Sequence, residues 1–103
     1  MTVGILPTAT RAGANAHLDV AIPTGLGEAR NALVVRAADA VIAIDGEFGT
    51  LSEIALALKM GKPVVGLDTW ELVKRGKAST SIHRATTAEQ AVSTALKLAQ
   101  NGN

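Results

Sequence analysis

The stretch Val41-Ile42-Ala43-Ile44-Asp45-Gly46-Glu47-Phe48-Gly49-Thr50-Leu51-Ser52-Glu53 decides the fold expected of this chain. Its first four residues are apolar and predict a short buried strand. Gly46 and Gly49 then allow a turn, and Thr50 opens an apolar-periodic segment that predicts a helix through Met60. A strand that runs through glycines into a helix presents unpaired backbone N–H groups and the positive end of the helix dipole, which together bind anions. The functional interpretation is a phosphate or nucleotide site, and the structural alternative is an ordinary strand–helix turn.

Composition narrows the class of protein. The 103 residues predict one domain over residues 1–100, followed by a disordered tail at 101–103. A net charge of +1 without a basic run argues against nucleic acid as a partner. The chain has no cysteine, which fits a reducing compartment, and no apolar run long enough to span a membrane, so a cytoplasmic location is expected. His17 and His83 are isolated, so neither a metal site nor a cofactor is expected.

Outward from the opening stretch, short apolar runs alternate with helical patterns. The segment 68–77 is mixed, with a helical turn expected at 70–74, and Thr86-Thr87-Ala88-Glu89 has the spacing of a capping box. The expected strands are 2–6, 19–22, 40–44, 63–67 and 80–84, and the expected helices are 27–39, 50–60 and the segment from 88 onward.

This alternation predicts the α/β class, with a parallel sheet of about 4–5 strands and helices on both faces, a Rossmann-like three-layer fold. Ligands of such sheets bind beyond the carboxyl ends of the strands. Two turns lie at that edge, at residues 23–28 and 45–50. Arg30 follows the first turn by one helical turn and Glu53 follows the second. If the two strands are neighbours, these two side chains converge on one crevice.

Three segments together resemble the Lonely Guy-type proteins, a superfamily often labelled lysine decarboxylase-like. They are Gly-Leu-Gly-Glu-Ala-Arg-Asn (25–31), Asp-Gly-Glu-Phe-Gly-Thr-Leu-Ser-Glu (45–53) and Gly-Lys-Pro-Val-Val-Gly (61–66). The family signature is Pro-Gly-Gly-x-Gly-Thr-x-x-Glu, preceded by a helix that bears an arginine. The resemblance runs from about Val3 to Gln100 and is nearest to the molybdenum-cofactor-carrier-like branch.

The resemblance implies a role for each matching residue. In the phosphoribohydrolase members, the arginine and glutamate that fall on Arg30 and Glu53 cleave the N-glycosidic bond of a nucleoside 5′-monophosphate. A carboxylate can stabilise the positive charge that develops on the sugar and can orient water, and a guanidinium can hold phosphate. The residues expected to bind the nucleotide or its phosphate are Thr24, Gly25, Gly27, Gly46, Gly49 and Thr50.

The chain departs from the family pattern in three places. Asp45-Gly46-Glu47 stands where the signature has Pro-Gly-Gly, which adds two negative charges where an anion should approach. Asn31 stands where the hydrolases have lysine. By the resemblance, the chain starts at what would be the third strand of family members, without their first two βα units, so a truncated fold that exposes a sheet edge is expected. Family members form homodimers through helices, and self-association as a homo-oligomer is expected here.

Three functions follow from these observations. The first is binding of a nucleoside monophosphate or another phosphate-bearing small molecule, with phosphoribohydrolase activity. The second is a non-catalytic carrier or binding role, as in the carrier-like branch. The third is self-assembly without a ligand.

Overall fold

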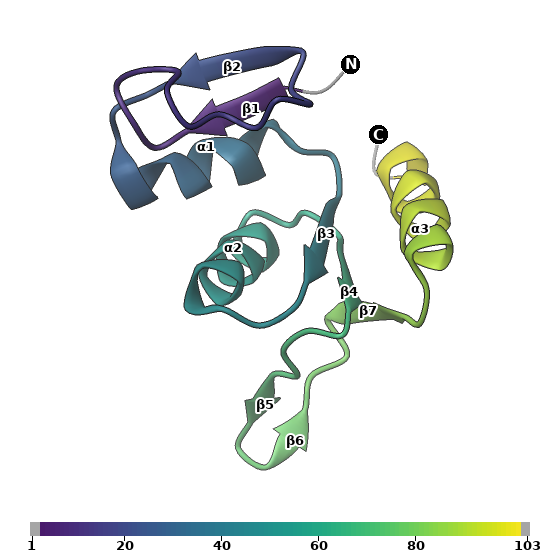
Figure 1. Cartoon of the computed structure of the whole chain (residues 1–103). Helices are drawn as coiled ribbons and strands as arrows, with labels where there is room; N and C mark the ends of the chain where they lie inside the picture. Colours follow the sequence, from purple (N-terminus) through teal and green to yellow (C-terminus); the bar gives the residue numbers. More distant parts are fainter. Residues whose placement is uncertain (1–2, 102–103) are drawn as a thin grey trace. The chain divides into compact units, whose positions relative to one another are not determined.

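The computed structural model describes residues 3–101, which divide into two compact units, Met1–Val34 and Val35–Asn103. Figure 1 shows the order of the elements along the chain. They are β1 (Val3–Leu6), β2 (Val20–Pro23), the 3₁₀ helix η1 (Gly27–Ala29), α1 (Arg30–Ala37), β3 (Val41–Ile44), α2 (Phe48–Lys59), β4 (Val64–Leu67), β5 (Val73–Lys74), β6 (Lys77–Ala78), β7 (Ile82–Ala85) and α3 (Ala88–Asn101).

The first unit is built on a pair of parallel strands. β1 and β2 pair in register, so that Leu6 lies opposite Pro23. The long connection between them contains no helix or strand, as its polar, glycine-containing sequence predicts. It is tied back to β2 by the Nε of Arg11, which donates to the backbone oxygen of Ala21 at 3.1 Å. The two strand ends are thereby fixed beside each other, and the turn into η1 follows directly.

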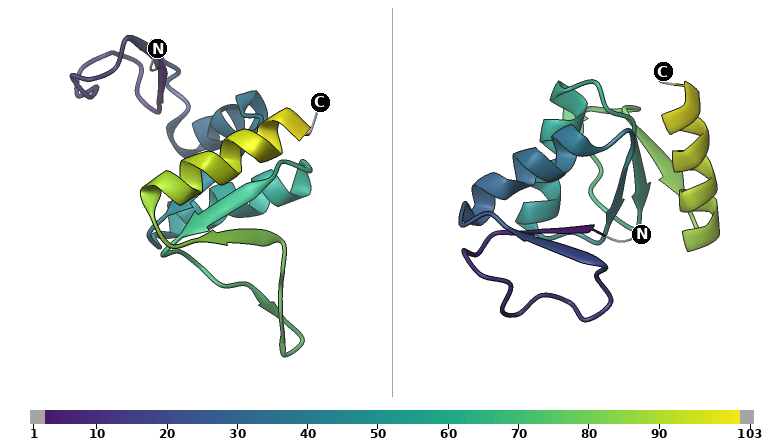
Figure 2. Two further views of the ribbon diagram at one scale, coloured as in Figure 1. Left: turned by 90° about the vertical axis from the view of Figure 1, so that its right-hand side faces the viewer. Right: turned by 90° about the horizontal axis from the view of Figure 1, so that it is seen from above.

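The second unit is a three-layer arrangement around the sheet β3-β4-β7, whose strands are all parallel. Val64 and Val65 of the central strand are both fully buried, and because successive strand residues point to opposite faces, each belongs to a different core. Val64 packs with Ile54 and Ala57 of α2. Val65 packs with α3. The views in Figure 2 show the sheet between these two helices.

α3 begins at Ala88, as the sequence predicts, whereas the start of α2 differs from the expectation. α2 begins at Phe48 rather than at Thr50. At α3 the cap is Thr87, whose Oγ1 accepts from the N–H of Gln90 at 3.1 Å, while the side-chain oxygen of Gln90 accepts from the N–H of Thr86 at 2.8 Å. The expected box began at Thr86 and ended at Glu89, so the observed one is shifted by one residue.

The segment after β4 forms a hairpin where a helical turn was expected, so that expectation was wrong. β5 and β6 pair antiparallel, and Lys74 lies opposite Lys77. The two residues between them, Arg75 and Gly76, have φ angles of 55° and 78°. Positive φ at both positions defines the turn that best matches the twist of two antiparallel strands.

The expected α/β class with parallel strands and flanking helices is confirmed. The five parallel strands, however, are divided between the sheets β1-β2 and β3-β4-β7. Asn101, expected in the tail, is the last residue of α3, and residues 102 and 103 lie outside the described part. Among the helices described, none combines the length and the apolar character needed to cross a membrane.

Candidate functional site

The carboxyl ends of β3 and β4 form one edge of the second unit. Ile44 pairs with Leu67, so the residues that follow, Asp45 and Asp68, leave the sheet side by side. Both adopt left-handed backbone conformations, with φ angles of 67° and 51°. The N–H of Asp45 still donates to the oxygen of Leu67, at 3.4 Å. Two carboxylates therefore stand at the edge where ligands of parallel sheets bind.

Trp70 fixes the start of α2 against this edge. Its Nε1 donates to the backbone oxygen of Glu47 at 3.2 Å, and its ring stacks on Phe48 with centroids 5.8 Å apart. The hydroxyl of Thr69 donates to the backbone oxygen of Asp45. Beside these contacts lies a shallow, open hollow of about 300 Å³, lined by Asp45, Gly46, Asp68, Thr69 and Trp70.

The N-terminus of α2 has no side-chain cap. Glu47 is the capping residue, with φ −75° and ψ 161°, and its side chain makes no capping hydrogen bond. Leu51 donates the first helical bond, to the oxygen of Glu47 at 3.1 Å. The N–H groups of the three preceding residues, 48–50, lie before that bond and are the donors that a helix leaves unsatisfied. Together with the helix dipole they form a site suited to an anion.

The two glycines of this turn are not required by the backbone, which corrects the expectation that they allow it. The positive φ belongs to Asp45, whereas neither Gly46 nor Gly49 is among the described glycines with positive φ. A Cβ at Gly49 would meet no atom within 4 Å, and one at Gly46 would meet only Trp70, at 3.8 Å. The space above Gly49 is therefore open.

Thr50 and Glu53 both lie on α2 and are both half-buried. Because the helix begins two residues earlier than expected, Thr50 is its third residue and Glu53 its sixth. Thr50 thus presents one of the three free N–H groups. Glu53 lies further along the helix than the sequence placed it, with its Cα more than one turn from the first residue.

In the first unit, the turn after β2 uses its own polar groups. Gly25 and Gly27 have φ angles of 67° and 58°, and their N–H groups donate to the oxygens of Thr8 and Pro7, each at 2.8 Å. The hydroxyl of Thr24 donates to the oxygen of Leu6 at 2.6 Å and accepts from the N–H of Leu26 at 3.2 Å.

The groups of this turn are thus engaged within the unit, and the assignment of Thr24, Gly25 and Gly27 to a nucleotide stays a prediction.

Arg30, the first residue of α1, is half-buried, and its Nε is fully buried without a hydrogen-bond partner among the described residues. An unpaired buried donor costs about 1–3 kcal/mol, so an acceptor placed there would be strongly favoured. The next residue, Asn31, is also buried. Arg30 belongs to the unit Met1–Val34 and Glu53 to the unit Val35–Asn103. Their convergence on one crevice stays a prediction.

Sequence reasoning missed Asp68 and Thr69 as residues of this edge. Asp68 follows a buried parallel strand just as Asp45 does, so the carboxyl-end rule applied to β4 would have found it. No periodic pattern in the sequence pointed to Phe48 as the stacking partner of Trp70. Within residues 3–101, no group of three or more His, Asp or Glu side chains is placed to hold a metal ion.

Comparison with known proteins identifies a family whose members this chain resembles. The model of the SLOG cluster4 family matches residues 1–96. An uncharacterised protein of Archaeoglobus fulgidus is 45% identical over 67 residues, which are 65% of this chain and 44% of that protein. The chain thus spans less than half the length of this relative.

One solved structure is similar over almost the whole chain. It is the molybdenum cofactor binding protein of the phototrophic bacterium Rippkaea orientalis, with a TM-score of 0.80 and 35% identity. The similarity covers 95% of this chain and 62% of that one.

Proposed function

The chain belongs to the SLOG cluster4 family, and from that premise we propose that it binds a phosphate-bearing small molecule at the N-terminus of α2. The observation that carries the proposal is the uncapped helix start, where three N–H groups precede the first helical bond. The similar structure from Rippkaea orientalis is that of a protein that binds a small molecule, the molybdenum cofactor. Gly49 supports the same site, because the open space above it leaves the backbone accessible to a ligand.

The proposed contacts follow from the chemistry of each group. The phosphate accepts from the N–H groups of residues 48–50 and from the hydroxyl of Thr50, while Gly46 and Gly49 let it approach the backbone. Arg30 contributes its guanidinium, whose buried Nε needs an acceptor. Thr24, Gly25 and Gly27 belong to the same unit as Arg30, and their contact with the ligand is part of the proposal. Asp45 and Glu47 oppose an anion, so the bound phosphate sits on the helix axis rather than over the turn.

A nucleoside 5′-monophosphate is the ligand that the Lonely Guy resemblance favours. In the catalytic version of the proposal, Arg30 holds the phosphate, and Glu53 stabilises the positive charge that develops on the ribose and orients the attacking water. Incubation with AMP should then release free adenine, and Glu53→Gln should abolish the release while AMP still binds. Binding without release would leave the carrier role, which the similarity to a cofactor-binding protein favours.

A thermal-shift titration tests the binding itself. AMP at 100 times its Kd should add about 2.7 kcal/mol to the free energy of unfolding. For a domain of this size each kcal/mol raises Tm by at least about 4 °C. Adenosine, which lacks the phosphate, is the matched control and should give a much smaller shift. No shift with AMP, inorganic phosphate or other nucleoside monophosphates would contradict the proposal and leave assembly without a ligand.

Self-association as a homo-oligomer is part of the same proposal. Ile42 and Ile44 of the outer strand β3 are exposed, although strands of a parallel sheet are usually covered on both faces. Light scattering at micromolar concentration should report a mass of at least two chains. A clean monomer would contradict this part and leave ligand binding untouched.

A further inference from the structure

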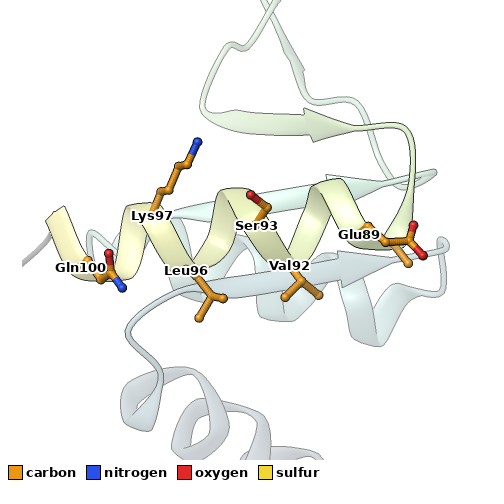
Figure 3. Close-up of a pocket in the computed structure, with 7 residues that line it drawn as sticks. Glu89, Val92, Ser93, Leu96, Lys97 and Gln100 are labelled. Atoms are coloured by element: carbon orange, nitrogen blue, oxygen red, sulfur yellow. The ribbon is translucent and has the colours of Figure 1, made fainter.

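The hollow at the carboxyl edge of the sheet is built differently from the groove on α3. The groove has a volume of about 670 Å³, and residues of α3 alone line it. Figure 3 shows Val92 and Leu96 pointing the same way from that helix, whereas Lys97 points elsewhere. The hollow is smaller, but it is lined by residues that follow two neighbouring strands, β3 and β4. Polar groups that come from several elements can fix the orientation of a small ligand.

A glycine in the central strand makes room beside this hollow. Gly66 is buried in β4, where a glycine weakens a strand because it has no side chain to pack. A Cβ at this position would lie 2.8 Å from Cγ2 of Thr69, 2.9 Å from Cγ2 of Ile82 and 3.2 Å from Nη1 of Arg84. These neighbouring side chains therefore occupy the space that a larger residue would take. The glycine allows a guanidinium to lie over the central strand.

Arg84 of β7 places the end of its side chain beside the hollow. It pairs with Gly66 in the parallel register, one residue before β7 ends. Its Nη1 and the methyl group of Thr69 both lie within 3.2 Å of the position over Gly66, and Thr69 lines the hollow. Among residues 3–101, the guanidinium of Arg84 makes no hydrogen bond and no ion pair. It is therefore available to a ligand at this edge.

Asp68 supplies the opposite charge in the hollow itself. It follows β4 directly, is exposed, and lines the hollow together with Thr69. Within the described part of the chain, its carboxylate also has no hydrogen-bond or ion-pair partner. Arg84 and Asp68 thus lie on either side of Thr69 without binding each other. The guanidinium offers parallel N–H donors and the carboxylate offers two acceptor oxygens, and both groups are unused.

These two groups favour a base that presents its acceptors and its donors in adjacent pairs. A guanidinium donates to two neighbouring acceptors, and a carboxylate accepts from two neighbouring donors. Guanine has the acceptors N7 and O6 side by side, followed by the donors N1–H and N2–H₂. Adenine alternates acceptor, donor and acceptor at N7, N6 and N1, so neither group can bind it twice. A base is also neutral, so the carboxylates at this edge do not repel it as they repel a phosphate.

We propose that the hollow takes the base of the bound nucleotide and that Arg84 and Asp68 select guanine over adenine. Arg84 donates to O6 and N7, and Asp68 accepts from N1–H and N2–H₂. The hollow includes residues just before α2, so the base lies next to the phosphate proposed at the N-terminus of that helix. The inference rests on the proposed function and specifies its ligand. It uses only residues of the unit Val35–Asn103.

The first test compares different bases on the same sugar phosphate. Isothermal titration calorimetry of the whole chain should give a Kd for GMP at least about 10-fold lower than that for AMP. IMP keeps O6, N7 and N1–H but lacks the 2-amino group, so its Kd should lie between the two. Equal affinity for GMP and AMP overturns this inference and leaves the proposed function standing. Binding of neither nucleotide overturns both.

The second test removes each of the two groups in turn. Asp68→Asn keeps the shape of the side chain and turns one acceptor into a donor, so the Kd for GMP should rise about 10-fold while AMP binds no more weakly. Arg84→Gln removes the guanidinium and should reduce the preference for GMP over AMP by about the same factor. A preference for GMP that survives both substitutions overturns the inference.

Asp39→Asn and Lys77→Gln are the matched controls for these variants. Both residues are exposed; Asp39 precedes β3 at the opposite edge of the sheet, and Lys77 lies on the hairpin. Each control removes the same kind of charge away from the hollow and should keep the preference of the wild type for GMP. An equal loss in the controls would show that the net charge of the chain sets the preference, and this would overturn the contacts assigned to Arg84 and Asp68.

Discussion

At the scale of single residues, the left-handed backbone position in the turn between β3 and α2 is occupied by an aspartate and not by a glycine. Asp45 carries the left-handed φ of 67°, whereas the glycines beside it do not need their freedom for the fold. Aspartate tolerates this conformation better than most residues with a Cβ, yet it still stores strain. The backbone strain therefore falls on Asp45, whereas the proposed ligand would use the glycines beside it. Substitutions at these neighbouring positions can separate the effect on folding from the effect on ligand binding.

Asp45→Gly should raise the free energy of unfolding by up to about 1 kcal/mol, because glycine adopts positive φ without strain. It also removes a carboxylate from the hollow, so the affinity for AMP should rise about twofold to fivefold at low salt. Chemical denaturation and the thermal-shift titration measure the two effects. Asp45→Asn is the matched control, since it removes the charge and keeps the Cβ. It should gain affinity without gaining stability, and weaker binding by Asp45→Asn would place the carboxylate among the ligand contacts.

Gly49→Ala should separate binding from folding in the other direction. A Cβ at Gly49 meets no atom within 4 Å, and alanine in place of glycine in a helix gains about 0.5–1 kcal/mol, so the variant should be at least as stable as the wild type. The same Cβ stands where the phosphate approaches, so the Kd for AMP should rise at least about 10-fold.

Gly61→Ala is the control for Gly49→Ala, because Gly61 follows α2 with a φ of 75° and lies away from the proposed site. It should lose about 1 kcal/mol or more of stability and keep its affinity. If Gly49→Ala binds as the wild type does, the phosphate does not approach this turn.

How much of the site could be predicted depended on the residues that mark the start of a helix in the sequence. Gly46, Gly49, Thr50 and Glu53 were predicted because glycines between an apolar run and a helix are typical of anion sites, and their part in binding stays a prediction. The true start of α2 was missed because Glu47 caps through its extended backbone alone and makes no side-chain bond. Such a cap leaves no trace in the sequence. The same applies to the stacking of aromatic residues 48 and 70, which depends on a loop conformation.

At the scale of elements, the ends of helices and strands were less predictable from the sequence than their interiors. The strands 41–44 and 64–67 fall within the expected ranges because their apolar runs have few alternatives. The hairpin at residues 73–78 was missed because Arg75 is not a usual residue for positive φ, so the sequence lacks the Asn-Gly signal of such turns. Its paired strands are two residues long, too short for a period to show.

The cap of α3 allows a test at this scale. Thr87→Ala removes the oxygen that accepts from the N–H of Gln90 and should cost about 1 kcal/mol of unfolding free energy. Ser93→Ala, in the exposed middle of the same helix, is the control and should change stability by less than about 0.5 kcal/mol. Urea denaturation followed by far-ultraviolet circular dichroism measures both. An equal loss in the two variants would show that the cap contributes nothing specific.

At the scale of the whole molecule, the class and the parallel strands follow from alternation alone, because buried parallel strands need continuous apolar runs. The sequence did not predict how the strands are divided between two sheets. Five parallel strands form a pair and a triplet, and no residue pattern marks the break between Val34 and Val35, which falls inside α1. The functional hypothesis depends on this scale, since Arg30 and Glu53 belong to different units.

A double-mutant cycle on ligand affinity tests whether those two side chains serve one site. Arg30→Gln and Glu53→Gln should each change the Kd for AMP. If both side chains contact the same ligand, the effect of the double variant should differ from the sum by at least about 0.5 kcal/mol, a little over twofold in Kd. Arg36→Gln is the matched control, because Arg36 is exposed in the last turn of α1, and its combination with Glu53→Gln should be additive. Additivity of the first pair as well would mean that no common crevice exists, and the N-terminus of α2 would then have to bind its ligand without the arginine.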